Sequence, residues 1–276
     1  MKAKLIQALK NLLINKPAFK MSTKVYIKYI IILSRLKLKS YKCFLPDKNS
    51  KFSIHQVTYN NHKIFFQSSV RISRFIKGFE HAGNRMWNRY KIDELLGGIE
   101  PRTIIDIGAN IGELSYYAAK KYSGRVKIFA FDPDPIVKQC FENNLIGIEA
   151  SFNLVALSNK SGEDYLYLKT DSADTSLHKP TGPSIKIKTK MITLDSFFNN
   201  LEVERPVLLK MDAEGHEPEV LLGGMATLKY IDWIAIDAGL ERYGKSTSDE
   251  VARILVDQGF SEVKISESYL VTAKNI

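Results

Sequence analysis

The feature that most constrains the fold is an alternation of short apolar runs and helical segments that begins at residue 103. The expected strands are TIIDI (103 to 107), VKIFAFD (126 to 132), SFNLVAL (151 to 157), VLLKMD (207 to 212) and WIAID (233 to 237). The expected helices cover residues 112 to 122, 135 to 145, 218 to 228 and 248 to 258. Such alternation predicts an α/β fold, in which helices cover both faces of a largely parallel sheet. Ligands of such sheets bind at the carboxyl ends of the strands.

Other segments depart from this alternation. EDYLYLK and SIKIKTK are two alternating segments joined by a polar loop at 170 to 184, and a terminal hairpin is expected at 261 to 273. Residues 51 to 68 predict a hairpin around Asn60 and Asn61. We expect three parts: a helical arm at 1 to 46, the hairpin and a helical region at 47 to 100, and a ligand-binding domain at 101 to 276.

The charge of the chain is concentrated in the arm. Residues 1 to 46 contain eleven Lys and Arg and no acid, whereas the remaining residues carry 29 basic and 30 acidic side chains. The apolar segment 25 to 38 is interrupted by Lys28 and Arg35, so it falls short of the roughly 20 apolar residues of a spanning helix. The arm is therefore expected either to lie on an anionic membrane surface or to pack as a solvated basic helix on the body.

The cysteine content bears on the compartment. Cys43 and Cys140 are the only two cysteines, which is too few for a disulfide framework or a cysteine metal site. A reducing compartment is expected, which places the protein in the cytoplasm, with peripheral contact at the inner face of the membrane if the arm binds lipid.

The first strand ends in a loop with the pattern D-x-G-x-x-x-G, formed by Asp106, Gly108 and Gly112. It does not match the G-x-G-x-x-G of dinucleotide-binding loops, and no G-K-[ST] of a phosphate-binding loop is present. A carboxylate at the strand end would repel a pyrophosphate and favour a cation. S-adenosylmethionine carries a sulfonium and an ammonium group, and the glycines would let the backbone approach it closely.

A second acid follows the next strand. Asp132 lies 26 residues after Asp106, where a carboxylate can accept hydrogen bonds from both hydroxyls of a ribose. The alternative is that Asp106 and Asp132 only cap the helices that follow them.

A cluster of charged residues precedes Pro218. Lys210, Asp212, Glu214, His216 and Glu217 lie at the end of the strand that begins at residue 207. Proline is favoured in the first turn of a helix, so these residues should form a loop at the ligand-bearing edge of the sheet. The neighbouring strand adds Asp237, Glu241 and Arg242 at the same edge.

Taken together, these segments resemble the FkbM family of S-adenosylmethionine-dependent methyltransferases. The matching segments are IIDIGANIGE, FAFDPDP, ITLDSFF, LLKMDAEGHEPEVLLGG and IAIDAGLER, which span about residues 60 to 270 and exclude the arm. The resemblance implies a Rossmann-like, seven-stranded class I methyltransferase sheet and O-methylation of a hydroxyl, commonly on a sugar or polyketide. It also implies that the functional loop lies at Lys210 to Glu217. The residues implied to hold the cofactor are Asp106, Gly108, Ala109, Asn110, Gly112, Asp132, Pro133 and Lys210.

Several residues are candidates for the base that takes the acceptor's proton, a contribution of roughly 10²–10⁴-fold to the rate. His216 is suggested by its ordinary pKa, and Asp212 or Glu214 could do this work or orient the hydroxyl. Asp237 and Glu241 are further candidates. A divalent cation held by carboxylates is an alternative, but no defined ligand spacing supports it, and no metal site is predicted.

Some of the charged residues also have structural interpretations. Lys210 is expected to pair with a nearby carboxylate, and Glu217 to interact with a helix amino terminus. The arginines between residues 71 and 89 are expected to be structural or to bind the cofactor carboxylate or an anionic substrate.

The sequence thus favours an O-methyltransferase that acts on a hydroxyl of a glycan precursor or related small molecule. One alternative is a nucleic-acid methyltransferase that uses the basic arm, but the segment 207 to 217 lacks a Pro-Pro-aromatic loop and no RNA-binding module is evident. A nucleic-acid partner is therefore not expected. The other alternative is a binding protein that has kept the cofactor fold without catalysis.

Overall fold

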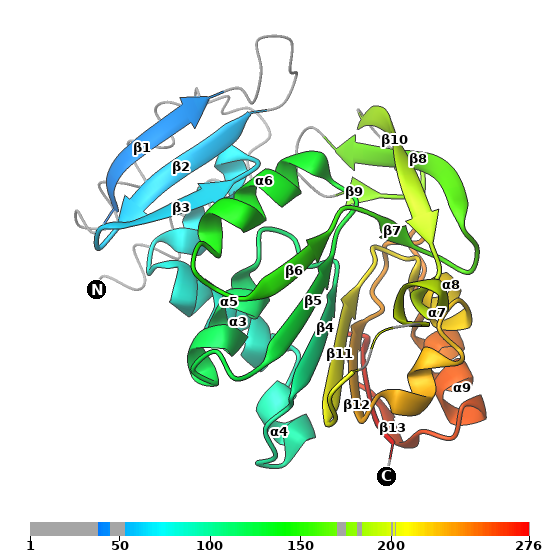
Figure 1. The fold of residues 1–276 in the computed structure, drawn as a ribbon. Coiled ribbons are helices and arrows are strands. Elements are labelled where there is room, and N and C mark those ends of the chain that lie inside the picture. Colours follow the sequence, from blue (N-terminus) through cyan, green and yellow to red (C-terminus); the bar gives the residue numbers. More distant parts are fainter. Residues whose placement is uncertain are drawn as a thin grey trace.

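The computed structural model describes residues 38–44, 53–169, 175–180, 184–199, 201 and 203–275. A seven-stranded sheet forms its centre (Figure 1). In spatial order the strands are β13 (Ser261–Ile265), β14 (Leu270–Lys274), β12 (Trp233–Asp237), β11 (Val207–Asp212), β4 (Thr103–Ile107), β5 (Lys127–Phe131) and β6 (Ala150–Asn153). Neighbours from β12 to β6 are parallel, and β14 is antiparallel to both β12 and β13. The predicted Rossmann-like, mostly parallel α/β fold is confirmed.

Helices cover both faces of this sheet, as the alternation predicts (Figure 1). On one face α3 (Phe79–Arg89), α4 (Ile92–Leu96) and α5 (Glu113–Lys121) pack on Ile104, Ile128 and Leu208. On the other face lie α7 (Leu194–Phe198), α8 (Glu217–Leu222), the 3-10 helix η2 (Thr227–Tyr230) and α9 (Ser248–Asp257). Successive residues of a strand point to opposite faces, so the apolar runs of the strands supply both layers of the core.

The segment 151 to 157 was expected to be a single strand, and the structure corrects this expectation. Residues 150 to 153 form β6, but Ala156–Leu157 form β7 of a second sheet. The second sheet has the order β7-β10-β8-β9 and contains β8 (Gly162–Lys169), β9 (Thr175–Ser176) and β10 (Ser184–Ile192). The chain leaves the main sheet at Asn153, whose side-chain amide donates to the carbonyl oxygen of Ala130 on β5.

A third sheet lies before the main one. Its strands are β1 (Leu38–Phe44), β2 (Ile54–Tyr59) and β3 (His62–Phe66), and Asn60 and Asn61 form the turn of the predicted hairpin with positive φ. The expectation of a helical arm is wrong for residues 38 to 44, because the backbone of β1 pairs with β2. Residues 1 to 37 of the arm lie outside the described residues, and the proposed three-part division stays a prediction.

The amino-terminal sheet packs on the main domain next to α6 (Pro135–Asn144). Ile64 and Phe66 of β3 share a core cluster with Ile136 and Phe141 of α6. The 3-10 helix η1 (Ser69–Phe75) connects β3 to α3, which lies along α5. This path brings η1 and α3 to the carboxyl-terminal edge of β4, where the candidate site lies.

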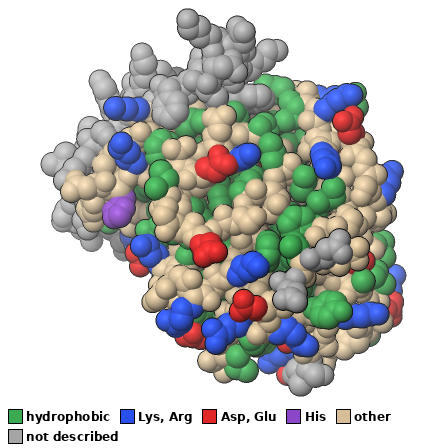
Figure 2. All heavy atoms as spheres, viewed as in Figure 1, with side chains coloured by type: hydrophobic (Ala, Val, Ile, Leu, Met, Phe, Trp, Pro, Cys, Tyr) green, Lys and Arg blue, Asp and Glu red, His purple; other side chains and the backbone are tan. Residues whose placement is uncertain are grey.

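Within the part of the chain that the structure describes, no helix is long and apolar enough to span a bilayer. On the face shown in Figure 2, basic and acidic side chains are interspersed, with hydrophobic side chains between them.

Candidate active site

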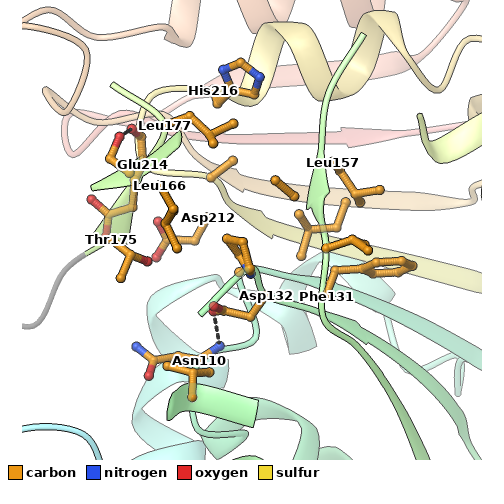
Figure 3. Close-up of a pocket in the computed structure, with 18 of the residues that line it drawn as sticks. Asn110, Phe131, Asp132, Leu157, Leu166, Thr175, Leu177, Asp212, Glu214 and His216 are labelled. Atoms are coloured by element: carbon orange, nitrogen blue, oxygen red, sulfur yellow. Dashed lines mark hydrogen bonds between the residues drawn. The ribbon is translucent and has the colours of Figure 1, made fainter. Parts of the chain in front are cut away.

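Two hollows lie at the carboxyl ends of the central strands. The first hollow extends from Asn110 and Asp132 past Asp212 to His216, with Leu157 and Phe131 on its apolar side (Figure 3). The second hollow lies under η1 and α3 and is lined by Arg85, Arg89, Asp237 and Glu241 among others.

The loop after β4 forms the floor between the hollows. The amides of Gly108 and Ala109 both donate to the carbonyl oxygen of Phe131, at 2.9 and 3.0 Å. Asn110 has a φ of +49°, and its amide donates to Asp132 at 3.0 Å. The loop is therefore tied to the end of β5, and Asp132 is fixed next to it.

Two glycines of this loop serve close packing. A Cβ on Gly108 would lie 1.9 Å from the carbonyl oxygen of Asp212, so only glycine lets the loop approach β11. A Cβ on Gly112 would lie 2.5 Å from Leu145 and 2.9 Å from Phe141. Gly108 lines both hollows, whereas Gly112 lines neither and serves the contact with α6 and the residue after it.

Asp106 and Lys210 form a buried ion pair below this loop. The Lys210 ammonium lies 3.1 Å from Asp106 Oδ1 and donates to the carbonyl oxygens of Ile107 and Gly108. The Ser115 hydroxyl donates to Asp106 Oδ2 at 2.7 Å. Burial alone would lower the pKa of Lys210, but Asp106 and Asp212 raise it above its ordinary value. Lys210 is thus an ion-pair partner, as expected, and Asp106 lines neither hollow.

Asp132 faces the first hollow, and Figure 3 shows its contact with Asn110. Its Oδ2 accepts from the amide of Asn110, and its Oδ1 accepts from the amide of Asp134 at 3.0 Å. Burial, with a smaller contribution from Asp134, raises the pKa of Asp132 to about 7. Pro133 lines the same hollow.

The turn after β11 is held by Glu217. This buried carboxylate accepts from the amides of Ala213 and Gly215 and from the hydroxyl of Thr247, at 3.1, 2.9 and 2.7 Å. Glu214 adopts a φ of +51°, which places its carboxylate at the edge of both hollows. Glu217 is the first residue of α8, where an acid that interacts with the helix amino terminus was expected. Its hydrogen bonds, however, go to amides of the preceding turn.

His216 lies at the far end of the first hollow from Asn110 (Figure 3). Its Nε2 is 3.0 Å from the hydroxyl of Ser158, and its Nδ1 is 3.6 Å from Glu219. Burial lowers the pKa of His216 to about 4, so the imidazole is neutral at neutral pH. Its role as the base stays a prediction.

The second hollow has an acidic wall and a basic wall. Asp237 and Glu241 follow β12, and Arg89 donates a hydrogen bond to Asp237. Burial raises the pKa of Asp237, as does Asp212, while Arg89 opposes this shift. Burial also raises the pKa of Glu241. The basic wall consists of arginines of η1 and α3 together with Lys169 of β8.

The two hollows share one border. The residues that line both are Arg71, Gly108, Asn110, Asp212 and Glu214. The buried hydroxyl of Tyr90 donates to Asp212 Oδ2 at 3.3 Å. A group passed from a ligand in one hollow to a ligand in the other would cross beside Asp212.

The first hollow fits S-adenosylmethionine in three respects. Its apolar end, with Phe131, Val155 and Leu157, suits a flat purine, and Asp132 offers hydrogen-bond acceptors for a ribose. Gly108, which has no side chain, exposes its backbone at the border. The buried Oε1 of Gln67, which has no hydrogen-bond partner among the described residues, offers a further acceptor.

Among the described residues, no three His, Cys, Asp or Glu are arranged to hold a metal ion.

Sequence reasoning missed several residues of the site. Gln67, Ser158 and His178 lie far along the chain from the motifs, and no local pattern marks them. The Gln67 amide donates to the side chain of Asn110 at 2.9 Å, and the ring of His178 is tilted by 55° against that of His216, with 5.5 Å between centroids. Only the tertiary fold brings Gln67 to the hollow, and Ser158 and His178 to His216.

Comparison with known families decides the assignment. The family model described as the methyltransferase FkbM domain matches residues 106–262, which is more than half of the chain. The chain belongs to the FkbM methyltransferase family. The methyl donor of this family is S-adenosylmethionine.

One curated relative of this FkbM protein is the hexuronic acid methyltransferase AglP of Haloferax volcanii. The two are 31% identical over 141 residues, which cover 50% of this chain and 56% of AglP. The chain thus matches only about half the length of that relative.

Solved structures with a similar fold are more distant. The magnesium protoporphyrin IX methyltransferase of Synechocystis is 11% identical, with a TM-score of 0.40 over 95% of this chain and 100% of that one. A precorrin-6y methyltransferase from Geobacter metallireducens is 12% identical, with a TM-score of 0.41 over 68% and 89%. The fold assignment rests on the strand order of the chain itself.

Proposed function

We propose that this S-adenosylmethionine-dependent methyltransferase transfers the methyl group to a hydroxyl oxygen of a sugar or related glycan precursor. The observation that carries the proposal is the shared border: a hollow with an apolar side and a hollow lined by charged side chains meet at Gly108, Asp212 and Glu214. Bringing two reactants together in a fixed orientation is a major part of the catalysis of such a transfer.

In this proposal the first hollow holds the cofactor. Phe131 and Leu157 contact the adenine, Asp132 accepts hydrogen bonds from the ribose hydroxyls, and Asn110 and Pro133 line the walls. Ala109 lines the second hollow. Asp106, Lys210 and Gly112 hold the loop from below. Asp106 and Gly112 line neither hollow, whereas Lys210 lines the second.

Asp212 is the best placed group to receive the acceptor's proton. When bound, S-adenosylmethionine supplies a methyl group on its sulfonium sulfur, and the leaving group is a neutral thioether. The Asp212 carboxylate would take the proton of the acceptor hydroxyl as its oxygen receives the methyl group. Tyr90 orients Asp212 through its hydrogen bond, and Glu214 is the alternative acceptor on the same border.

The other candidate bases are less well placed. His216 lies at the end of the first hollow that is farthest from Asn110, and it does not line the second. Asp237 and Glu241 line only the second hollow, and Asp237 is engaged by Arg89. We propose that Asp237 and Glu241 position the acceptor and that His216 shapes the cofactor pocket.

The sugar acceptor is supported by the relative and by the site. AglP is named for methylation of a hexuronic acid. A hollow lined by carboxylates and arginines suits a ligand with many hydroxyl groups, because each can donate to an acid and accept from a guanidinium.

A methyl-transfer assay tests the proposal. The protein is incubated with methyl-labelled S-adenosylmethionine and a panel of neutral and acidic sugar nucleotides, and the product is examined for a base-stable methyl ether. Asp212→Asn should lower kcat roughly 10²-fold or more, with affinity for S-adenosylhomocysteine held within about twofold. The control is Asp257→Asn, an exposed change on α9. A methyl ester or methylamine product, or full activity in Asp212→Asn, would contradict the proposal.

A further inference from the structure

We propose that the second hollow binds an anionic group of the acceptor, a carboxylate or a phosphate ester, through Arg85 and Lys169. The inference rests on the proposed function and adds the chemical class of the substrate.

Lys210 of β11 lines this hollow but is paired with Asp106, and the other cations come from three elements. η1 supplies Arg71 and Arg74, α3 supplies Arg85 and Arg89, and the end of β8 supplies Lys169. Arg85 and Arg89 are four residues apart, so they lie on the same face of α3. Segments distant in the sequence therefore place five cations besides Lys210 around one hollow.

Most of these arginines have charged neighbours within the protein. Arg89 is hydrogen-bonded to Asp237. Burial raises the pKa of Glu113, while Arg74 and Arg71 act against this shift, which places both arginines close to that carboxylate. Their positive charge is thus partly compensated by groups already present.

Arg85 and Lys169 differ from them. Neither has an ion-pair partner among the residues that the structure describes, although both line the hollow. Arg85 is exposed on α3, and Lys169 is partly buried. Two cations without an ion-pair partner among the described residues, beside a hollow with an acidic wall, favour a ligand that carries its own negative charge.

The two walls also define an orientation. Asp212, Asp237 and Glu241 lie at or after the ends of β11 and β12, and Arg85 of α3 lines the other wall of the same hollow. An acceptor whose anionic group faces Arg85 and Lys169 would direct a hydroxyl toward Asp212. A neutral sugar would have no such constraint.

The geometry argues that these cations serve the acceptor. Arg85 and Lys169 line only the second hollow, whereas Arg71 lines both. The carboxylate of the cofactor's methionine part would be reached from the shared border, where Arg71 lies.

Calorimetry on the full chain saturated with S-adenosylhomocysteine tests the inference. Glucuronate, glucose 6-phosphate and glucose are titrated into the wild type, into Arg85→Gln and into the control Arg253→Gln on the exposed side of α9. We expect at least one of the two anionic sugars to bind about tenfold more tightly than glucose. Arg85→Gln should remove most of this preference, and the control should keep it. The better anionic ligand identifies carboxylate or phosphate.

The contrary outcomes are distinct. Equal binding of glucose and both anionic sugars, or no binding of either anion, would overturn the inference while leaving the methyltransferase proposal intact. Weaker binding of S-adenosylhomocysteine by Arg85→Gln would assign this arginine to the cofactor instead. Failure of the wild type to bind S-adenosylhomocysteine would overturn both proposals.

Discussion

At the scale of single residues, the site depends on buried carboxylates held by backbone amides and by one lysine. Asp132 accepts from two amides, Glu217 accepts from two amides and a hydroxyl, and Asp106 pairs with Lys210. Such groups keep their geometry because a buried carboxylate that loses a partner is costly. They fix the loop and the turn before any ligand arrives.

The pKa of Asp132, raised to about 7, predicts a pH dependence of cofactor binding. Only the ionised carboxylate can accept hydrogen bonds from both ribose hydroxyls, so affinity for S-adenosylhomocysteine should rise as pH increases through 7. Calorimetry between pH 5.5 and about 8.5 measures this, and Asp132→Asn should flatten the profile.

The same shift has a consequence of opposite sign for stability. The pKa of Asp132 is higher in the folded than in the unfolded chain, so its contribution to stability is present at low pH and is lost as pH rises through about 7.

The affinity measurement can contradict the prediction. A wild-type affinity for S-adenosylhomocysteine that does not change with pH, or that falls as pH rises, would contradict the assignment of Asp132 to the ribose.

The Asp106 and Lys210 pair predicts strong coupling between two substitutions. Lys210→Met leaves a buried carboxylate without its partner and should lower the free energy of unfolding by about 3–5 kcal/mol. The double variant Asp106→Asn/Lys210→Met should recover a large part of this loss. Urea unfolding of both single variants and the double variant measures the coupling. Additive losses in the free energy of unfolding would contradict a stabilising interaction between Asp106 and Lys210.

At the scale of elements, the close approach of the β4 loop to β11 creates the border between the hollows. Gly108 has a φ of +66°, and a Cβ there would collide with the backbone of Asp212. Gly124 has a φ of +74°, but a Cβ there would meet nothing within 4 Å. A comparison of the two positions therefore distinguishes the effect of backbone strain from the effect of the contact with β11.

Alanine at these two positions should have different effects. Both variants carry the cost of a positive φ, about 1 kcal/mol or more, but only Gly108→Ala must push β11 away from the loop. We expect Gly108→Ala to weaken S-adenosylhomocysteine binding by at least about tenfold and Gly124→Ala to leave it unchanged within about twofold. Similar affinities in both variants would mean that the contact does not shape the site.

The elements that the sequence predicts well are those with local signals. TIIDI corresponds to β4 at both ends, and Pro135 starts α6 as expected. The loop carboxylates were predicted to meet because parallel strands end at one edge. By contrast, β1 pairs through backbone bonds with a strand that follows it, and Ala156–Leu157 join a separate sheet. The pairing of Ala156–Leu157 with β10 depends on a distant partner, as does the contact between His216 and Ser158.

At the scale of the whole molecule, the uneven charge of the chain bears on its location. The eleven basic residues of 1 to 46 leave a body of nearly balanced charge. A polybasic segment near an anionic bilayer gains about 1 kcal/mol per Lys or Arg. The arm therefore remains predicted to bring the site to an anionic membrane surface at the cytoplasmic face.

Vesicle binding tests the role of the arm. The full chain should sediment with vesicles that contain anionic lipid, and about 0.5 M salt should release it because screening shortens the range of the attraction. Replacing Lys2, Lys4, Lys10, Lys16 and Lys20 with Gln should reduce binding, whereas the same number of Gln replacements on the body should not. Equal binding by both variants would contradict a role for the arm.

The most direct test of the central claim, that the first hollow binds S-adenosylmethionine beside Asp212, is calorimetric titration with S-adenosylmethionine and with NAD. We predict binding of the sulfonium cofactor alone, weakened about tenfold or more by Asp132→Ala, because hydrogen bonds to a charged group contribute about 1.5–3 kcal/mol. Preference for NAD, or no binding of S-adenosylmethionine, would contradict the account and remove the basis for the roles given to Asp132 and Asp212.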